Sequence, residues 1–186
     1  MMTSNNADKE AYVWIWLPET TAPVVAGKLE ADDQGNIQFN YGKSYLERVN
    51  ASPPAIPIYE PELPLKKGVL PPPDGLTMPG CIRDSAPDAW GRRVIINKKL
   101  GRKGKDADTD TFGELTYLLE SGSDRIGALD FQRSPTEYIP RSPTNVPLAE
   151  LFESSVRVEQ GVPLTPELDQ ALFHGSSIGG ARPKAL

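Results

Sequence analysis

Eight of the twenty-one residues from Pro53 to Pro73 are proline, and this density constrains the fold more than any other feature of the sequence. Each proline removes an amide donor and fixes φ, so neither a long helix nor a central strand can run through the segment. Apolar residues separate the prolines in Ile56–Tyr59 and Leu63–Leu65, which favours extended pieces at a sheet edge. We therefore expect a structural wrap around the core, with a ligand for an SH3-type domain as the alternative.

Strand patterns precede this segment. Tyr12–Leu17 is β-branched and aromatic, which predicts a strand buried on both faces. Two further runs, Val24–Ala31 and Ile37–Tyr41, are joined by a polar connection containing glycine, so we expect a hairpin and a small antiparallel sheet. Ser44–Val49 could add a helical turn. The tryptophans of the first strand, Trp14 and Trp16, are expected in the core, with a stacking platform for bases or sugars as the alternative.

Helix signals follow the proline segment. Ser85 is expected to cap a helix that ends near Leu100, with Pro87 in its first turn and Asp88 at its positive end. Thr111–Glu114 has the form of a capping box for a second helix that ends at Gly122.

The remaining segments complete an α+β order of elements. We expect a strand over Ile126–Phe131 and a surface connection over Ser134–Pro147, followed by a helical hairpin built from Pro147–Val156 and a helix beginning at Thr165. Because the sheet comes first and the helices follow, the fold class is a small antiparallel β-sheet followed by packed helices, not an alternating βαβ fold.

Composition limits the classes of protein to which the chain can belong. A length of 186 residues with 38% hydrophobic and 24% charged residues suits one globular domain or two small subdomains. The net charge of −5 and the pI of about 5.0 argue against general attraction to nucleic acid or anionic lipid. The single cysteine, Cys81, excludes an intramolecular disulfide. With no secretory signal and no run of about 20 apolar residues, we expect a cytoplasmic protein without a membrane span.

Positive charge is concentrated in one stretch of fourteen residues that contains no acid. A solvated helix face and loop is the ordinary explanation, and a contact with phosphates or an acidic partner is the functional alternative. The candidate contact residues are Arg92, Arg93, Lys98, Lys99 and Arg102, with Lys103 and Lys105 following.

The segment His174–Leu186 combines glycines with a lysine, as a phosphate-holding loop would, but it matches neither the Walker A pattern nor the full glycine loop of protein kinases. His174 is the only histidine, so a metal site is not expected. A nucleophile pair with Ser176 or Ser177 would lack a third group to orient the base.

Several blocks together resemble the HipA-type serine/threonine kinases, the toxins of bacterial toxin–antitoxin systems. The similarity begins in the first sheet at Val24–Leu29 and Phe39–Leu46. More specific is Arg83–Arg93, which is similar to the family block D-S-x-P-D-x-W-G-R-R. Asp124–Phe131 resembles D-R-x-G-A-L-x-F, and Ser177–Lys184 resembles the nucleotide loop S-x-G-G-A-x-x-K.

The resemblance implies that Gly179, Gly180, Ala181 and Lys184 belong to a loop over ATP phosphates and that Ser177 is an autophosphorylation position. It also implies a division of the chain into a disordered tail (1–10), an N-terminal subdomain (11–133), a helical hairpin leading to the kinase core (134–173) and a truncated nucleotide loop (174–186). The implied partners are an antitoxin of the HipB type and a kinase core, with nucleic acid contacted only through the antitoxin.

The family's catalytic residues would lie beyond Leu186, because phosphoryl transfer needs a lysine, a catalytic aspartate and groups that hold magnesium. We therefore expect these 186 residues to be inactive alone, as the product of a truncated, interrupted or split gene, and to bind neither ATP nor Mg²⁺ appreciably. The alternative is a stand-alone module that docks on a separately encoded kinase core or antitoxin and regulates it.

Overall fold

The computed structural model describes residues 8–100, 108, 110, 112–123, 125, 127–141, 148–160 and 162. Two compact units divide the chain: Met1–Ser85 with Gly127–Ile139, and Ala86–Ile126 with Pro140–Leu186. We call them the sheet unit and the helical unit. The chain crosses from one unit to the other after Ser85, after Ile126 and after Ile139.

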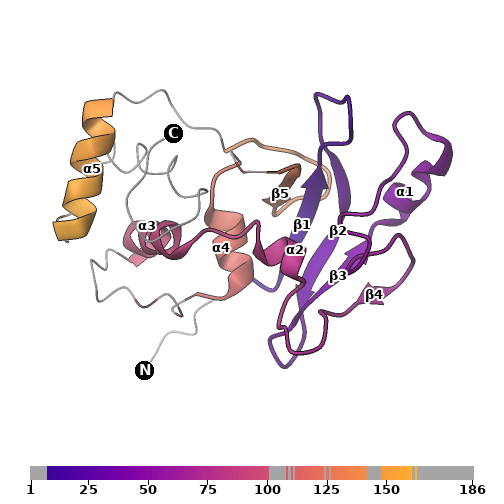
Figure 1. Cartoon of the computed structure of the whole chain (residues 1–186), viewed down its shortest axis with the longest axis horizontal. Helices are drawn as coiled ribbons and strands as arrows, with labels where there is room; N and C mark the ends of the chain where they lie inside the picture. Colours follow the sequence, from indigo (N-terminus) through magenta and orange to yellow (C-terminus); the bar gives the residue numbers. More distant parts are fainter. Residues whose placement is uncertain are drawn as a thin grey trace. The chain divides into compact units, whose positions relative to one another are not determined.

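The sheet unit is built on five antiparallel strands in the order β4-β3-β2-β1-β5 (Figure 1). Their bounds are β1 Glu10–Ile15, β2 Val24–Ala31, β3 Ile37–Tyr41, β4 Val69–Leu70 and β5 Leu129–Gln132. The predicted hairpin has the bounds that the sequence indicates. Its turn is held by Asp32, whose carboxylate accepts the N–H groups of Gln34 and Asn36 at 2.9 and 2.8 Å.

Three strands differ from the prediction. The strand expected at Tyr12–Leu17 is β1, which begins at Glu10 and ends at Ile15. The expected strand at Ile126–Phe131 begins at Leu129 and pairs with β1, placing Phe131 opposite Val13. The strand at the far edge is β4, which lies a few residues beyond the expected edge pieces at Ile56–Tyr59 and Leu63–Leu65. Of those pieces, Tyr59 and Leu63 form a single antiparallel bridge.

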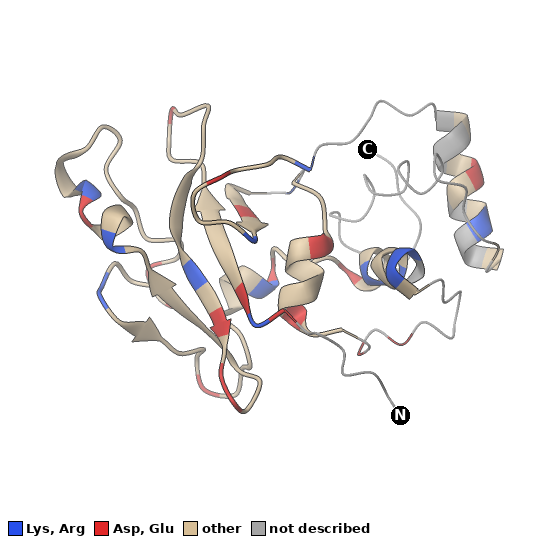
Figure 2. Cartoon of the chain, turned by 180° about the vertical axis from the view of Figure 1, so that it is seen from behind, with Lys and Arg blue, Asp and Glu red and all other residues tan. Residues whose placement is uncertain are grey.

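One face of the sheet carries the core of the sheet unit. Val13, Leu29 and Phe39 are fully buried there, on three neighbouring strands. The other face carries Lys28, which lies 3.3 Å from a carboxylate oxygen of Glu10 and 3.2 Å from one of Glu30. Charged residues of β1 and β2 are visible in Figure 2. Trp14 is 7% exposed and donates its indole N–H to the carbonyl of Ser134, which confirms its core assignment, whereas Trp16 is only half-buried.

Short helices complete the sheet unit: α1 Lys43–Leu46, a 3-10 turn at Arg48–Asn50, and α2 Gly80–Arg83. The first two correspond to the expected helical turn, and α2 is an addition that the sequence patterns do not predict. The proline segment lies against this unit as the expected wrap, since the buried hydroxyl groups of Tyr41 and Tyr45 bind its backbone.

The helical unit contains α3 Ala89–Leu100, α4 Glu114–Glu120 and α5 Leu148–Gln160. Its described core brings together Ile95 and Ile96 of α3 with Tyr117 of α4, and Phe112 packs against them. Together with the sheet, these helices confirm the α+β class. The expected helix at Thr165 lies outside the described residues, so the helical hairpin stays a prediction.

The predicted cap of α3 is wrong. The carboxylate of Asp88, not the hydroxyl of Ser85, accepts the N–H of Gly91 at 2.7 Å, and the helix begins at Ala89. Ser85 instead donates its hydroxyl to the carbonyl of Cys81. The capping box of α4 is also not formed as expected, because Gly113 is the N-cap and makes no side-chain cap bond. Thr111 lies outside the described residues.

Candidate functional site

The block Arg83–Arg93 runs from the last residue of α2 into the first turns of α3, across the crossing after Ser85. Asp88 fixes the start of α3, and Trp90 in the first turn is 2% exposed. The indole N–H of Trp90 is buried without a hydrogen-bond partner among the described residues. The block therefore contains the chain crossing between the two units. It also contains the residue that caps the first turn of α3.

Arg92 is the most extensively bonded residue of this block. Its Nη1 and Nη2 atoms each lie 2.7 Å from a carboxylate oxygen of Glu114, and its Nε donates to the carbonyl of Pro87 at 3.2 Å. The guanidinium also lies 4.6 Å from the centre of the Tyr117 ring. Burial lowers the pKa of Arg92, but the bonds and charge of Glu114 outweigh it and the pKa is raised overall. Arg92 therefore ties the start of α3 to α4.

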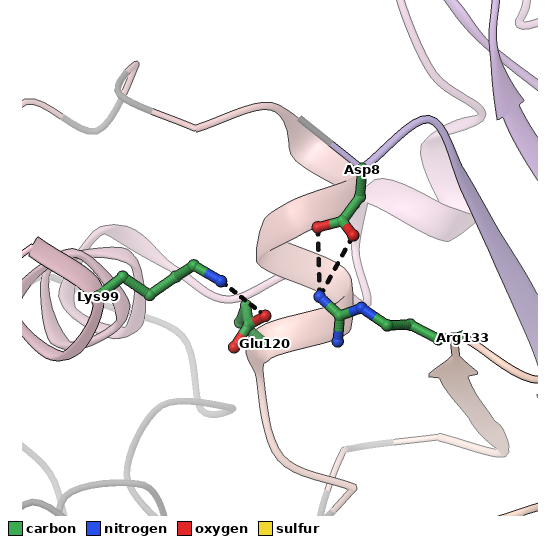
Figure 3. Close-up of polar contacts among 4 residues, drawn as sticks. All are labelled: Asp8, Lys99, Glu120 and Arg133. Atoms are coloured by element: carbon green, nitrogen blue, oxygen red, sulfur yellow. Dashed lines mark hydrogen bonds and ion pairs between the residues drawn. The ribbon is translucent and has the colours of Figure 1, made fainter. Parts of the chain in front are cut away.

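A second pair joins the other ends of the same helices. Lys99 Nζ lies 2.8 Å from a carboxylate oxygen of Glu120 (Figure 3). It also lies 5.8 Å from the centre of the Phe112 ring. Figure 3 also shows Arg133 of the sheet unit, whose Nη2 lies 3.3 Å from each carboxylate oxygen of Asp8. Two of the five basic residues proposed to contact a partner, Arg92 and Lys99, thus have acidic partners within the helical unit.

The other proposed contact residues are described by their exposure. Lys98 is exposed near the end of α3, and Arg93 is half-buried. Arg102 lies outside the described residues. Exposure leaves the Lys98 ammonium accessible to an acidic or phosphorylated partner, and Arg93 is partly accessible.

The second block, Asp124–Phe131, crosses back into the sheet unit between Ile126 and Gly127. Its arginine, Arg125, donates from Nη2 to the carbonyl of Leu118 and to the hydroxyl of Ser121, both at 2.6 Å. These bonds satisfy groups at the C-terminal end of α4, where a cation is favourable. Asp130 is fully buried and accepts the N–H of Phe131 at 2.7 Å. Asp124 itself lies outside the described residues.

The third block lies outside the described residues altogether. The proposed nucleotide-loop residues Gly179, Gly180, Ala181 and Lys184, the proposed phosphorylation site Ser177, and His174 are therefore known from the sequence alone. Within the described part of the chain, no group of three or more His, Cys, Asp or Glu side chains is placed to hold a metal ion.

Sequence reasoning did not identify the partners of the basic residues. Glu114 was recognised only as part of a capping box, and Glu120 and Ser121 were not singled out. The spacing of 22 residues between Arg92 and Glu114 carries no local signal, because the two residues meet only when α3 and α4 pack together. Tyr117 was missed because it lies beside the leucine pattern used to predict α4.

The helices of the described residues include none that is long and apolar enough to cross a membrane.

Residues 15–132, more than half of the chain, match the family model described as the HipA N-terminal domain. The matched region contains the Arg83–Arg93 and Asp124–Phe131 blocks and ends before the third block. No curated protein matches the chain.

Proposed function

Because this chain belongs to the HipA N-terminal domain family, we propose that it is the N-terminal part of a HipA-like serine/threonine protein kinase, the toxin of a type II toxin–antitoxin system. The family match is the observation that carries this proposal. The order of the three blocks supports it, since the glycine-rich segment follows the matched region as it does in the kinase pattern. Such a protein acts in the bacterial cytoplasm.

The proposed role of the third block is to cover the phosphates of ATP. Gly179 and Gly180 allow backbone N–H groups to approach the phosphates, and Lys184 adds a positive charge. Phosphorylation of Ser177 would place about two negative charges beside them and oppose binding of the triphosphate. ATP and Mg²⁺ would be held together with a catalytic lobe, which supplies the lysine, the aspartate and the metal-holding groups.

The test is a kinase assay on the 186-residue protein, alone and mixed with a catalytic lobe encoded at the same locus. We expect no phosphoryl transfer by the protein alone and activity in the mixture. Calorimetry with Mg-ATP should detect absent or very weak binding by the protein alone, because one loop without the opposite wall must also order itself on binding. Activity or tight ATP binding by the 186 residues alone would overturn this proposal.

Arg93 and Lys98 are the proposed contact residues for an acidic partner, because Lys98 is exposed near the end of α3 and Arg93 is partly accessible. Charge reversal to Arg93→Glu and Lys98→Glu should weaken binding to the antitoxin or the catalytic lobe, and more so at low salt. Reversal of the exposed Lys43, which lies on α1 of the sheet unit, is the matched control. Equal losses from all three reversals would contradict a specific contact on α3.

A stand-alone binding module is the second candidate. It is favoured by the core of the sheet unit, in which residues of β1, β2 and β3 bury one another completely. Such a unit could dock on a separately encoded kinase core, or on an antitoxin of the HipB type, without chemistry of its own. A binding module should co-purify stably with that partner without any gain in phosphoryl transfer. Restored phosphoryl transfer in the mixture would favour the first candidate.

A further inference from the structure

A cavity of about 490 Å³ lies in the sheet unit, to which all of its lining residues belong. Four segments line it: the end of β1 with Trp16, the proline segment with Ile58, α2 and its following turn with Cys81, and the start of β5 with Ala128. Cavities of about 300–1,000 Å³ with mainly apolar walls are typical of small-molecule sites. The volume is therefore suitable for a small organic ligand.

Hydrogen bonds fix the wall of the cavity that the proline segment forms. The N–H groups of Ile56 and Ile58 donate to the hydroxyls of Tyr45 and Tyr41 at 3.2 and 2.9 Å, and Pro57 between them has no N–H group. The amide donors of this wall are therefore bonded to two tyrosines that are not part of the lining. A wall fixed in this way needs little ordering when a ligand binds.

The same end of β1 leads into a tight turn that places Pro18 in the lining. Both the N–H and the hydroxyl of Thr20 donate to the carbonyl of Leu17, at 3.1 and 2.7 Å. Glu19 within this turn has a φ of 63°, in the left-handed region that a non-glycine residue adopts at a cost. The turn is thus imposed by its surroundings, and with it the position of the Pro18 ring.

The lining carries no charged side chain. Its titratable group is Cys81, and burial together with the neighbouring Glu62 carboxylate raises the pKa of this thiol to about 12. The thiol is therefore neutral at physiological pH. Because an unpaired charge is costly to bury, the cavity suits an uncharged ligand.

Trp16 gives the cavity an aromatic surface. Its ring centre lies 5.4 Å from that of Tyr138, with an angle of 89° between the planes, and the residue remains half-exposed. The edge-to-face contact fixes the indole without covering it completely. The same lining contains Pro18 and Pro57, whose apolar rings suit contact with a planar ligand.

We propose that this cavity binds a small, uncharged, planar aromatic molecule that stacks on Trp16. None of the lining residues belongs to α3, α4 or the glycine-rich block, whereas Ser85 and Gly127–Leu129 belong to the first two motif blocks. The proposal agrees with the alternative role of Trp16 as a stacking platform, whereas Trp14 belongs to the core.

The test uses the ¹⁵N-labelled 186-residue protein and unlabelled indole as the probe. The chain has three tryptophans, so its side chains give three indole N–H signals, which single Trp→Phe variants assign. We expect the Trp16 signal to shift saturably, with half-saturation at about 0.1–1 mM for a ligand of this size. Indole-3-carboxylate should bind at least about tenfold more weakly, because its charge would be buried without a partner.

Ala128→Phe is the variant that fills the cavity, and Ala149→Phe in α5 makes the same change at another exposed position. We expect the first to abolish the Trp16 shift and the second to preserve it, with thermal unfolding of both compared to confirm folding. If Ala128→Phe fails to fold, Ala128→Leu makes the same comparison. The proposal is overturned if indole causes no saturable shift, if the filled variant binds equally well, or if only an aromatic side chain in a partner protein occupies the cavity.

Discussion

The rings of Tyr41 and Tyr45 are stacked, with their centres 5.7 Å apart and only 5° between their planes. The Tyr41 hydroxyl donates to the carbonyl of Leu63 at 2.7 Å and accepts the N–H of Ile58 at 2.9 Å. The Tyr45 hydroxyl donates to the carbonyl of Ile56 at 2.8 Å. A segment whose prolines limit its own backbone hydrogen bonds thus obtains further partners from two side chains of β3 and α1.

Replacing Tyr41 with Phe should lower the free energy of unfolding by about 1–3 kcal/mol, because two backbone groups lose a buried partner. Tyr45→Phe should have a similar effect, since its hydroxyl serves both backbone groups of Ile56. Chemical denaturation provides the measurement. The control is Tyr59→Phe at a half-exposed position, which should change stability by no more than about 0.5 kcal/mol. Equal effects at all three positions would contradict the role of the hydroxyls.

Stability should also fall in alkali. Burial raises the pKa of Tyr41 from 10.0 to about 12, against the lowering effect of the Ile58 hydrogen bond. The folded state therefore prefers the neutral hydroxyl. Its contribution is complete below pH 10 and is lost as the pH rises toward 12. Denaturation of the wild type across this range should show the decline.

Tyr41→Phe should make this decline shallower, because a phenyl ring does not ionise. Cys81 contributes with the same sign, since burial raises its pKa from 9.0 to about 12. Comparison in a Cys81→Ser background isolates the tyrosine. An unchanged decline in Tyr41→Phe would show that Tyr41 does not titrate in this range.

Gly27 in β2 should not tolerate a side chain. A Cβ atom there would lie 2.6 Å from Cζ of Phe39 and would also overlap the carbonyl oxygen of Asn40. Because backbone cannot yield cheaply, we expect Gly27→Ala to lower the free energy of unfolding by about 1–3 kcal/mol. Gly42→Ala is the control, since its Cβ would meet Ala26 at an ordinary 3.7 Å. Similar thermal stability of the two variants would contradict the close approach.

The parts of the fold that sequence patterns predict are those with local causes. The hairpin of β2 and β3 depends on alternation and on a turn within eighteen residues, and its bounds are predicted correctly. In contrast, β5 pairs with β1, which lies more than one hundred residues earlier in the sequence. No local pattern predicts that pairing. The two-residue strand β4 is too short to show alternation at all.

The same distinction applies to the candidate site. Motif blocks identify Arg92 by its neighbours in sequence, but they do not indicate that Glu114 neutralises it, because that contact arises from helix packing. The start of α3 shows a different difficulty, since Ser85 and Asp88 are both good capping residues separated by Pro87. The choice between them depends on the backbone path through the unit crossing, which the residue types do not specify.

The two ion pairs between α3 and α4 should contribute unequally. Arg92 and Glu114 form a bidentate pair with side chains 19% and 32% exposed, and Tyr117 adds a cation–π contact. Arg92→Met should cost about 2 kcal/mol, because bonds to charged groups are among the stronger ones. Lys99→Met, the matched change, breaks one hydrogen bond to Glu120 and a distant contact with the Phe112 ring, and should cost at most about 1 kcal/mol.

The two ion pairs should also differ in how their contribution to stability depends on salt. Raising the ionic strength from about 0.1 to 1 M shortens the screening length from about 10 to 3 Å. The effect of Lys99→Met on the free energy of unfolding should then diminish more than that of Arg92→Met, as measured by urea denaturation at each salt concentration. Equal losses at low salt would mean that the bidentate geometry contributes nothing.

Substitutions can test which residue caps the N-terminus of α3. The sequence favours Ser85, whereas the structure shows Asp88 in this role. Asp88→Ala removes the carboxylate that accepts the Gly91 N–H and should lower the free energy of unfolding by about 1 kcal/mol, within the usual range for caps. Asp88→Asn should retain most of the effect, because its side-chain oxygen can still accept the bond. Ser85→Ala removes a 3.3 Å bond to the Cys81 carbonyl, leaves the Gly91 bond in place and should cost less than Asp88→Ala. Hydrogen exchange of the Gly91 amide provides the local measurement, with faster exchange expected in Asp88→Ala and not in Ser85→Ala; the reverse order would restore Ser85 as the cap.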